Sequence, residues 1–255
     1  MEENFLLYKM SWPEIAEKLK ENPIVLVPIG STEQHGMHLP IDNDAYTAFE
    51  FAKKIAEKAS KEVPVLVAPL IPYGVSQHHM NFPGTVTLRT KTLAHVLEEV
   101  CKSLIHHGFK KIVIVNGHGG NITAINMALQ KVGEETDAFL AVINWWEIAI
   151  DVISKLAETP FFHACETETS VALALDQKVN MEKAKGEVPT TPSKFIKFDF
   201  LAPPPKISTS IPSLDKLTKT GSVGDPTKAS REKGEKIISV VIERAVEFLK
   251  EVAKI

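Results

Sequence analysis

Short runs of consecutive apolar residues recur along the chain and indicate buried strands. They cover residues 24–29, 63–70, 111–115 and 139–143. These runs are rich in β-branched residues and lack the alternation of apolar and polar positions that marks a strand with one wet face. Continuous apolar runs are typical of parallel strands that helices cover on both sides. The pattern therefore predicts a mostly parallel sheet.

Longer segments with apolar residues at helical spacing separate or follow these runs. Residues 44–60, 90–107 and 225–255 place apolar side chains three and four positions apart, with Lys and Glu between them. Alternating strands and helices favour an α/β fold. Residues 186–224 show neither period and include Pro203-Pro204-Pro205. Such a segment is either a lid or contact loop or a mobile connection. No domain boundary is evident, so we treat residues 1–255 as one domain.

Composition narrows the class of protein. The 255 residues are 44% apolar and 24% charged, with a formal charge of −3, which is ordinary for a soluble domain with a buried core. This charge offers no basic surface, so we expect no nucleic-acid partner. Cys101 and Cys165 lack the spacing of a disulfide framework or a thiolate metal site. No run is long enough to span a membrane and the first residues do not resemble a signal peptide, so we expect a cytoplasmic protein.

The richest group of candidate ligands follows the first apolar run. Residues 31–44 carry Glu33, His35 and Asp44. Carboxylates and imidazoles without thiolates are typical of a Zn, Mn or Fe site that keeps a position open for water or substrate. Asp44 could instead cap the next helix. Each residue alone has such a structural explanation, and only the group favours a metal.

A second group, Asn-Gly-His-Gly-Gly-Asn at residues 116–121, follows another apolar run directly. Ligands of open α/β sheets bind beyond the carboxyl ends of strands. His118 therefore suits a metal ligand, although it could also be a turn histidine bonded to the backbone.

A third group, residues 163–170, resembles the first turns of a helix. In such a helix His163 and Glu166, three positions apart, share a face, while Glu168 lies away from Glu166. Early glutamates also suit the helix dipole, which is the structural alternative.

Further polar and aromatic residues could line a substrate pocket. Residues 73–85 contain Ser76 and His79, which either contact a substrate or belong to a plain loop. Trp145 and Trp146 follow the last apolar run and either wall a pocket for a flat polar ligand or pack in the core.

Together these segments resemble the creatininase family of metal-dependent amidohydrolases, which includes creatininase and an archaeal formamidopyrimidine deformylase. The matching motifs are, in chain order, Gly30–Gly36 with Leu39-Pro40 and Asp44, then Phe82–Thr85, Asn116–Asn121 and His163–Ser170. The resemblance implies a three-layer α/β/α sandwich, a centre of two divalent ions (Zn, Mn or Fe) and a homo-oligomer, usually a hexamer.

The resemblance also implies roles by position. The implied ligands of one metal are Glu33, Asp44 and His118, and those of the other are His35, Asp44 and Glu168. The implied catalytic pair is His163, which would handle protons, and Glu166, which would orient or assist it. The implied pocket residues are Ser76, His79, Gly119 and Trp146.

One departure from creatininase bears on the substrate. Creatininase has a tyrosine and a glutamate directly after the histidine of its Asn-Gly-His motif, whereas this chain has Gly119 and Gly120. A substrate contact and a metal ligand are thereby missing, which argues against creatinine itself. The double glycine is shared with the deformylase branch.

The expected function is metal-dependent hydrolysis of a non-peptide C–N bond, in a small cyclic amide or formamide, by a metal-activated water. Two alternatives stay open. One is peptidase-like trimming of a peptide-derived precursor. The other is a non-catalytic subunit that binds metal or ligand on the same scaffold.

Overall fold

The computed structural model describes residues 4–191, 193, 195–202, 210 and 212–255, and Pro203-Pro204-Pro205 lie outside them. Its sheet has four parallel strands in the order β2-β1-β3-β4. The strands are β1 (Ile24–Ile29), β2 (Val65–Val67), β3 (Lys111–Asn116) and β4 (Phe139–Asn144). All four expected runs form strands, but β2 is shorter than predicted. Pro64 and Pro69 flank it, and proline cannot donate to a strand ladder.

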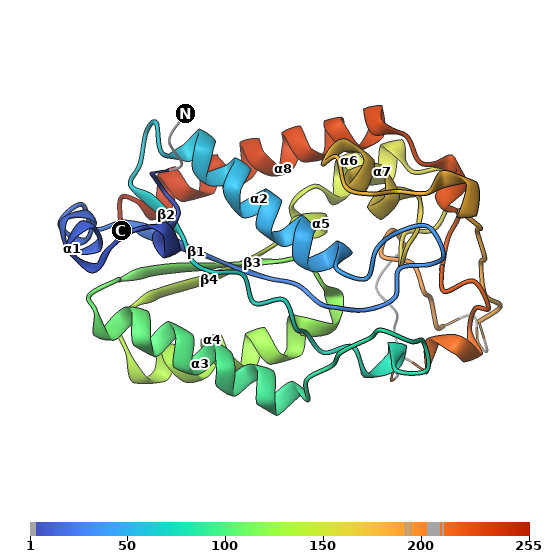
Figure 1. Ribbon diagram of the computed structural model, residues 1–255, viewed down its shortest axis with the longest axis horizontal. Helices are drawn as coiled ribbons and strands as arrows, with labels where there is room; N and C mark the ends of the chain where they lie inside the picture. The colour runs from blue at the N-terminus through green and yellow to red at the C-terminus, as the bar shows by residue number, and fades with distance from the viewer. Residues whose placement is uncertain (1–3, 192, 194, 203–209, 211) are drawn as a thin grey trace.

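Helices cover both faces of the sheet, which confirms the α/β class and the predicted layers (Figure 1). On one face lie α2 (Asn43–Ala59), α5 (Trp145–Ile148), α6 (Ile150–Leu156), α7 (Glu166–Ala174) and α8 (Arg231–Val252). On the other lie α3 (Thr90–His106) and α4 (Ile122–Glu135). Alternate strand residues feed the two cores. Leu26 packs with the α2–α8 layer and Val27 with the α3–α4 layer, because successive side chains of a strand point to opposite faces.

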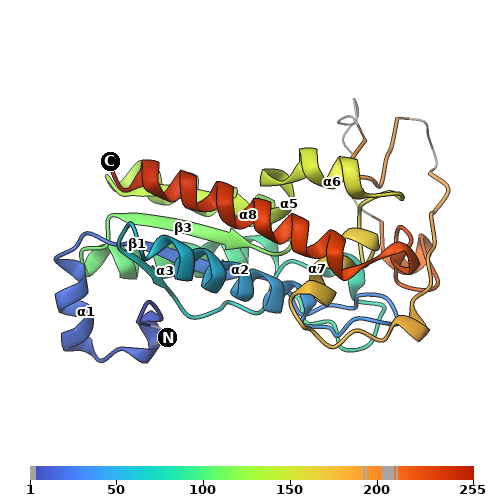
Figure 2. The same cartoon turned by 90° about the horizontal axis from the view of Figure 1, so that it is seen from above.

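The remaining elements lie at the two ends of the sheet. Helix α1 (Trp12–Leu19) lies at the end opposite α7, as Figure 2 also shows. The short 3-10 turns are η1 (Leu7–Lys9), η2 (Gln77–His79), η3 (Gly119–Asn121), η4 (Met181–Lys183), η5 (Leu214–Lys216) and η6 (Pro226–Lys228). The described part of residues 186–224 forms no helix or strand other than η5, and it lies at the α7 end (Figure 1).

Two predicted helices begin later than expected. Helix α8 begins at Arg231 rather than at residue 225, because Pro226 opens a separate turn and Ser230 caps the helix by accepting from Lys233 N–H at 3.3 Å. Helix α7 begins at Glu166, so His163 precedes it. Ala164 has a left-handed φ of +46°, which turns the chain between them. No helix in the described ranges is long and apolar enough to cross a bilayer.

Candidate metal centre

The predicted ligands gather where the carboxyl ends of β1 and β3 meet the first turn of α2. Glu33 and His35 follow β1, His118 follows β3, and Asp44 lies in α2. Gly117 makes the close approach possible, because a Cβ there would lie 2.2 Å from the Asp44 carbonyl oxygen. The glycine therefore serves the contact between His118 and Asp44.

Three overlapping groups of donor atoms result, each with its atoms within 4.8 Å of one another. They are Glu33–Asp44–His118, His35–Asp44–Glu168 and Glu33–His35–His163. The first two are the ligand sets that the family resemblance implied, with Asp44 shared. His118 Nδ1 lies 2.9 Å from Asp44 Oδ2, and His35 Nε2 lies 2.8 Å from Asp44 Oδ1. The geometry thus supports both predicted sets.

The burial of the donor atoms also supports binding of a divalent cation. Glu33 Oε1, His35 Nε2 and Asp44 Oδ2 are buried, and no hydrogen bond of good geometry satisfies them, although each lies close to another charged group of the centre. Such atoms carry a desolvation cost that a bound cation would offset. Oxygen and imidazole donors without sulfur suit Zn, Mn or Fe.

The charged side chains shift one another's pKa values strongly. Burial alone would lower the pKa of His35, but the Asp44 carboxylate raises it to about 10. Burial would likewise lower the pKa of His118, but Glu33 and Asp44 raise it to about 9. Burial raises the pKa of Glu168 to about 7. Without a metal, the imidazoles and the Glu168 carboxyl therefore hold protons more strongly than usual. A cation that binds these groups would displace those protons.

Glu33 is held by side chains behind it. Ser31 Oγ donates to Glu33 Oε2 at 3.0 Å, and Ser76 bonds to Ser31. His79 Nε2 lies 3.1 Å from Glu33 Oε1. Ser76 was expected to contact substrate, but it is fully buried and supports Glu33 instead. Partners of this kind fix the orientation of a ligand.

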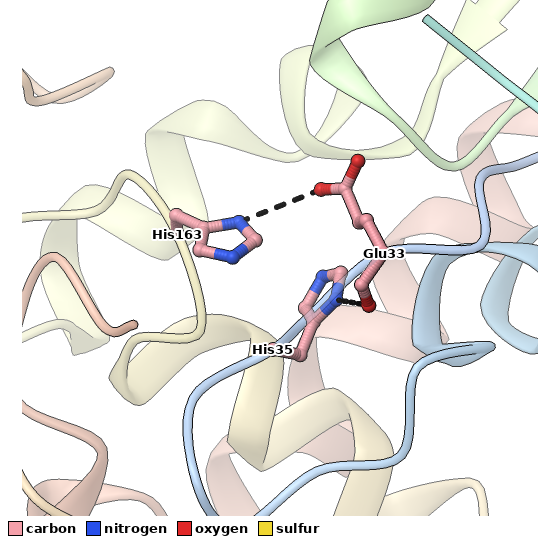
Figure 3. A group of neighbouring side chains, drawn as sticks. All are labelled: Glu33, His35 and His163. Atoms are coloured by element: carbon pink, nitrogen blue, oxygen red, sulfur yellow. Dashed lines mark hydrogen bonds and ion pairs between the residues drawn. The ribbon is translucent and has the colours of Figure 1, made fainter. Parts of the chain in front are cut away.

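His163 reaches the same centre from the loop before α7 (Figure 3). Its Nδ1 lies 3.8 Å from Glu33 Oε1, and its Nε2 donates to the Gln34 carbonyl at 2.9 Å. Burial, together with nearby His35, lowers the pKa of His163 well below its usual value. A neutral imidazole therefore faces Glu33, where it can accept a proton or bind a cation.

Glu166 does not join His163, contrary to the prediction. The turn at Ala164 breaks the expected helical spacing, and the Glu166 carboxylate points toward α8. Lys233 Nζ donates to Glu166 Oε1 at 2.5 Å, and the backbone N–H groups of Glu158 and Thr159 donate to Oε2 at 2.9 and 3.1 Å. Glu166 thus anchors the loop that leads to His163 and does not orient its ring.

A pocket of about 130 Å³ opens beside the centre. His79, Gly119 and Trp146 line it, as predicted. Phe162 and Phe200 add aromatic walls, with ring centroids 5.4 Å apart in a stacked arrangement. Trp145 instead packs in the core against Phe51.

Sequence reasoning missed the polar residues that hold these loops. Asn121 joins three of them, since its amide donates to the Gly30 carbonyl at 2.9 Å and accepts from Val75 N–H at 2.9 Å. The Gln34 amide nitrogen lies within 3.1 Å of His79 Nδ1, His163 Nε2 and the Gly221 carbonyl oxygen. The only signal was their position beside predicted ligands, because amide side chains have no diagnostic spacing.

Comparison with known proteins finds relatives that cover most of the chain. The chain is 34% identical over 233 residues to the "Mycofactocin precursor peptide peptidase" of Mycolicibacterium smegmatis, covering 89% of this chain and 85% of that protein. It is 27% identical over 271 residues to the "Creatinine amidohydrolase" of Pseudomonas putida, covering 98% of each. The solved structure named "Creatininase Mn" superposes with a TM-score of 0.79 at 25% identity, covering 97% of this chain and 98% of that one.

The creatininase family model, described as creatinine amidohydrolase, matches residues 8–249. This match spans the sheet, both helical layers and every donor of the centre. The chain therefore belongs to the creatininase family of metal-dependent hydrolases.

Proposed function

We propose that this protein hydrolyses the amide C–N bond of a small non-peptide molecule, a cyclic amide or formamide, with two divalent ions as cofactors. The observation that supports this most is that the two predicted donor sets, which share Asp44, form beside a small pocket. The described residues that line this pocket include no Lys or Arg. A neutral amide suits such a wall better than a charged ligand does.

Bound ions would lower the pKa of a water and polarise the amide carbonyl. The protein side chains would supply the rest. Glu33, Asp44 and His118 would hold one ion, and His35, Asp44 and Glu168 the other. His163, neutral and facing Glu33 through Nδ1, would take a proton from the attacking water and pass it to the leaving nitrogen. Trp146 and Phe200 would pack against the substrate and exclude water.

The test is hydrolysis by purified protein that has been stripped with a chelator and reloaded separately with Zn, Mn or Fe. The substrate panel contains creatinine, formylated aminopyrimidines and short peptides, and the readouts are creatine from the opened ring, formate from the formamides and new amino groups from the peptides. We expect activity only after reloading and only on the small amides. Asp44→Asn should abolish it, because both donor sets lose their shared carboxylate.

Asp42→Asn is the matched control. Asp42 lies two residues earlier, is exposed and belongs to none of the donor groups, so this variant should keep full activity. Hydrolysis that survives chelation would refute the metal-dependent mechanism. Tight metal binding without hydrolysis of any amide would favour a non-catalytic binding role.

The second candidate is trimming of a peptide-derived precursor. The 34% identity to a protein named as a precursor peptide peptidase, over 89% of the chain, favours it. Phe200, 40% exposed at the pocket, could then contact a peptide side chain. Hydrolysis of the short peptides, and not of the small amides, would establish this reading.

A further inference from the structure

We propose that Gln34 is a positioning residue whose carboxamide fixes which ring nitrogens of His79 and His163 carry protons. Gln34 Nε2 lies 3.0 Å from His79 Nδ1, 3.1 Å from His163 Nε2 and 3.0 Å from the Gly221 carbonyl oxygen. Gln34 Oε1 accepts from Gly36 N–H at 2.9 Å. Because Gly36 N–H can only donate and the Gly221 carbonyl can only accept, the amide has one workable orientation.

The amide group has two hydrogens and three neighbours that could accept them. One hydrogen goes to the Gly221 carbonyl. His79 Nδ1 faces the amide nitrogen of Gln34, which can only donate, so it must accept the second hydrogen, and the ring proton of His79 then lies on Nε2. His79 Nε2, which carries this proton, lies 3.1 Å from Glu33 Oε1. An N–H group beside a carboxylate is electrostatically favourable.

His163 has a different way to satisfy its Nε2. With both amide hydrogens used, Nε2 carries the ring proton and donates to the Gln34 backbone carbonyl at 2.9 Å. On a neutral His163 ring, Nδ1 then has the lone pair, 3.8 Å from Glu33 Oε1 (Figure 3). Gln34 thus presents the unprotonated nitrogen of His163 to the centre. The catalytic consequence rests on the proposed function, whereas the positions of the protons do not.

The surroundings of Gln34 hold its carboxamide in place. Gln34 is 6% exposed, and Gly221, with φ +82°, packs so closely that a Cβ there would lie 2.1 Å from Gln34 Oε1. Any other residue at this position would collide with the amide. The loop after β1 and the last part of the irregular segment are therefore joined at Gln34.

Nitrogen-15 NMR of the full-length, metal-free protein labelled at histidine tests the proposal, because protonated and unprotonated imidazole nitrogens differ in chemical shift. Spectra of His79→Asn and His163→Asn assign the signals. In the wild type we expect both rings to carry their proton on Nε2. In Gln34→Glu, whose carboxylate can only accept, we expect His79 Nδ1 to gain a proton. Gln130→Glu, on the exposed face of α4, adds the same charge and should change neither ring.

A proton on His79 Nδ1 in the wild type, or none there in a folded Gln34→Glu, would overturn the proposal. Should Gln34→Glu fail to fold, Gln34→Met replaces it. The lost hydrogen bond should then shift the His79 Nδ1 signal, and an unchanged signal would also overturn the proposal. In the metal-loaded enzyme, Gln34→Met should lower kcat by about 10–100-fold, as outer partners of ligands do, with KM changed less. Since the NMR readout needs neither metal nor substrate, its failure is distinguishable from failure of the hydrolase function.

Discussion

At the scale of single residues, the buried hydroxyl of Ser76 could either support the metal ligand Glu33 or contact the substrate. It bonds to Ser31, which donates to Glu33. Ser76→Ala should therefore weaken metal affinity by about 10–100-fold, because Glu33 loses its support. KM measured with saturating metal should stay unchanged. Metal titration by calorimetry and steady-state kinetics separate the two quantities.

The control for this variant is Ser103→Ala, an exposed position on α3 whose hydroxyl donates only within its own helix. It should change neither metal affinity nor KM. A raised KM with unchanged metal affinity in Ser76→Ala would restore the original expectation that Ser76 contacts substrate.

The ligand residues could be predicted from the sequence because their types are chemically selective and three of them lie close together in the chain. Glu33, His35 and Asp44 occupy twelve consecutive positions, and few roles other than a metal site need that combination. The direction of a loop side chain has no such signature. Ser76 and Glu166 were therefore assigned to the right region and to the wrong contacts, and Gln34 was given no role.

At the scale of elements, α8 packs on α7 at a distance that only glycine allows. A Cβ at Gly234 would lie 1.9 Å from the Ser170 carbonyl oxygen. Gly234→Ala should thus lower the free energy of unfolding by about 3 kcal/mol, at the upper end of overpacking costs. Gly133→Ala, in α4 with no atom within 4 Å of a new Cβ, should raise it by about 0.5–1 kcal/mol. Urea unfolding measures both, and equal effects would contradict the tight packing of α7 on α8.

The same two helices are joined by a buried ion pair. Glu166 is 1% exposed at its side chain and Lys233 is 20% exposed, whereas the pair of Arg231 and Asp176 is 47% and 81% exposed. Lys233→Met should cost about 3–5 kcal/mol by leaving the Glu166 carboxylate without its cation. Arg231→Met should cost less than about 1 kcal/mol. Thermal and urea unfolding report the difference.

A double variant checks the cause of that loss. Glu166→Gln combined with Lys233→Met removes the stranded charge, so it should recover part of the lost stability. Were Glu166 to act on His163 after all, Glu166→Gln alone would reduce kcat at least tenfold without loss of stability.

Periodicity predicted the elements well wherever packing alone decides them. The apolar runs of β1 and β3 and the helical spacing of α2 and α3 match the structure within a residue or two. Boundaries failed where local backbone chemistry intervenes. Proline shortens β2 and delays α8, and the left-handed Ala164 delays α7. Of these three places, the Ala164 turn leads directly from His163 to α7 and so lies beside the centre.

At the scale of the whole molecule, the centre joins parts of the chain that are far apart in sequence. Its donors come from the loops after β1 and β3 and from α2 and α7, so they meet only in the folded chain. A ligand that binds only the folded state stabilises it by RT ln(1 + [L]/Kd), about 2.7 kcal/mol at one hundred times Kd. Burial and the nearby Asp44 carboxylate both raise the pKa of Glu33, and a bound cation would offset the repulsion between the two carboxylates. Metal binding and global stability should therefore be coupled.

We accordingly expect chelation to lower the unfolding temperature by about 5–10 °C, given roughly 2–4 °C per kcal/mol for a chain of this size, and reloading to restore it. Differential scanning calorimetry at fixed protein concentration measures the shift. Asp44→Asn should remove the dependence on metal, because both predicted donor sets lose the residue they share, while Asp42→Asn should keep it. A shift of the same size in Asp44→Asn would mean that the stabilising ion binds elsewhere, and the centre built by the β1 and β3 loops would then not be the metal site.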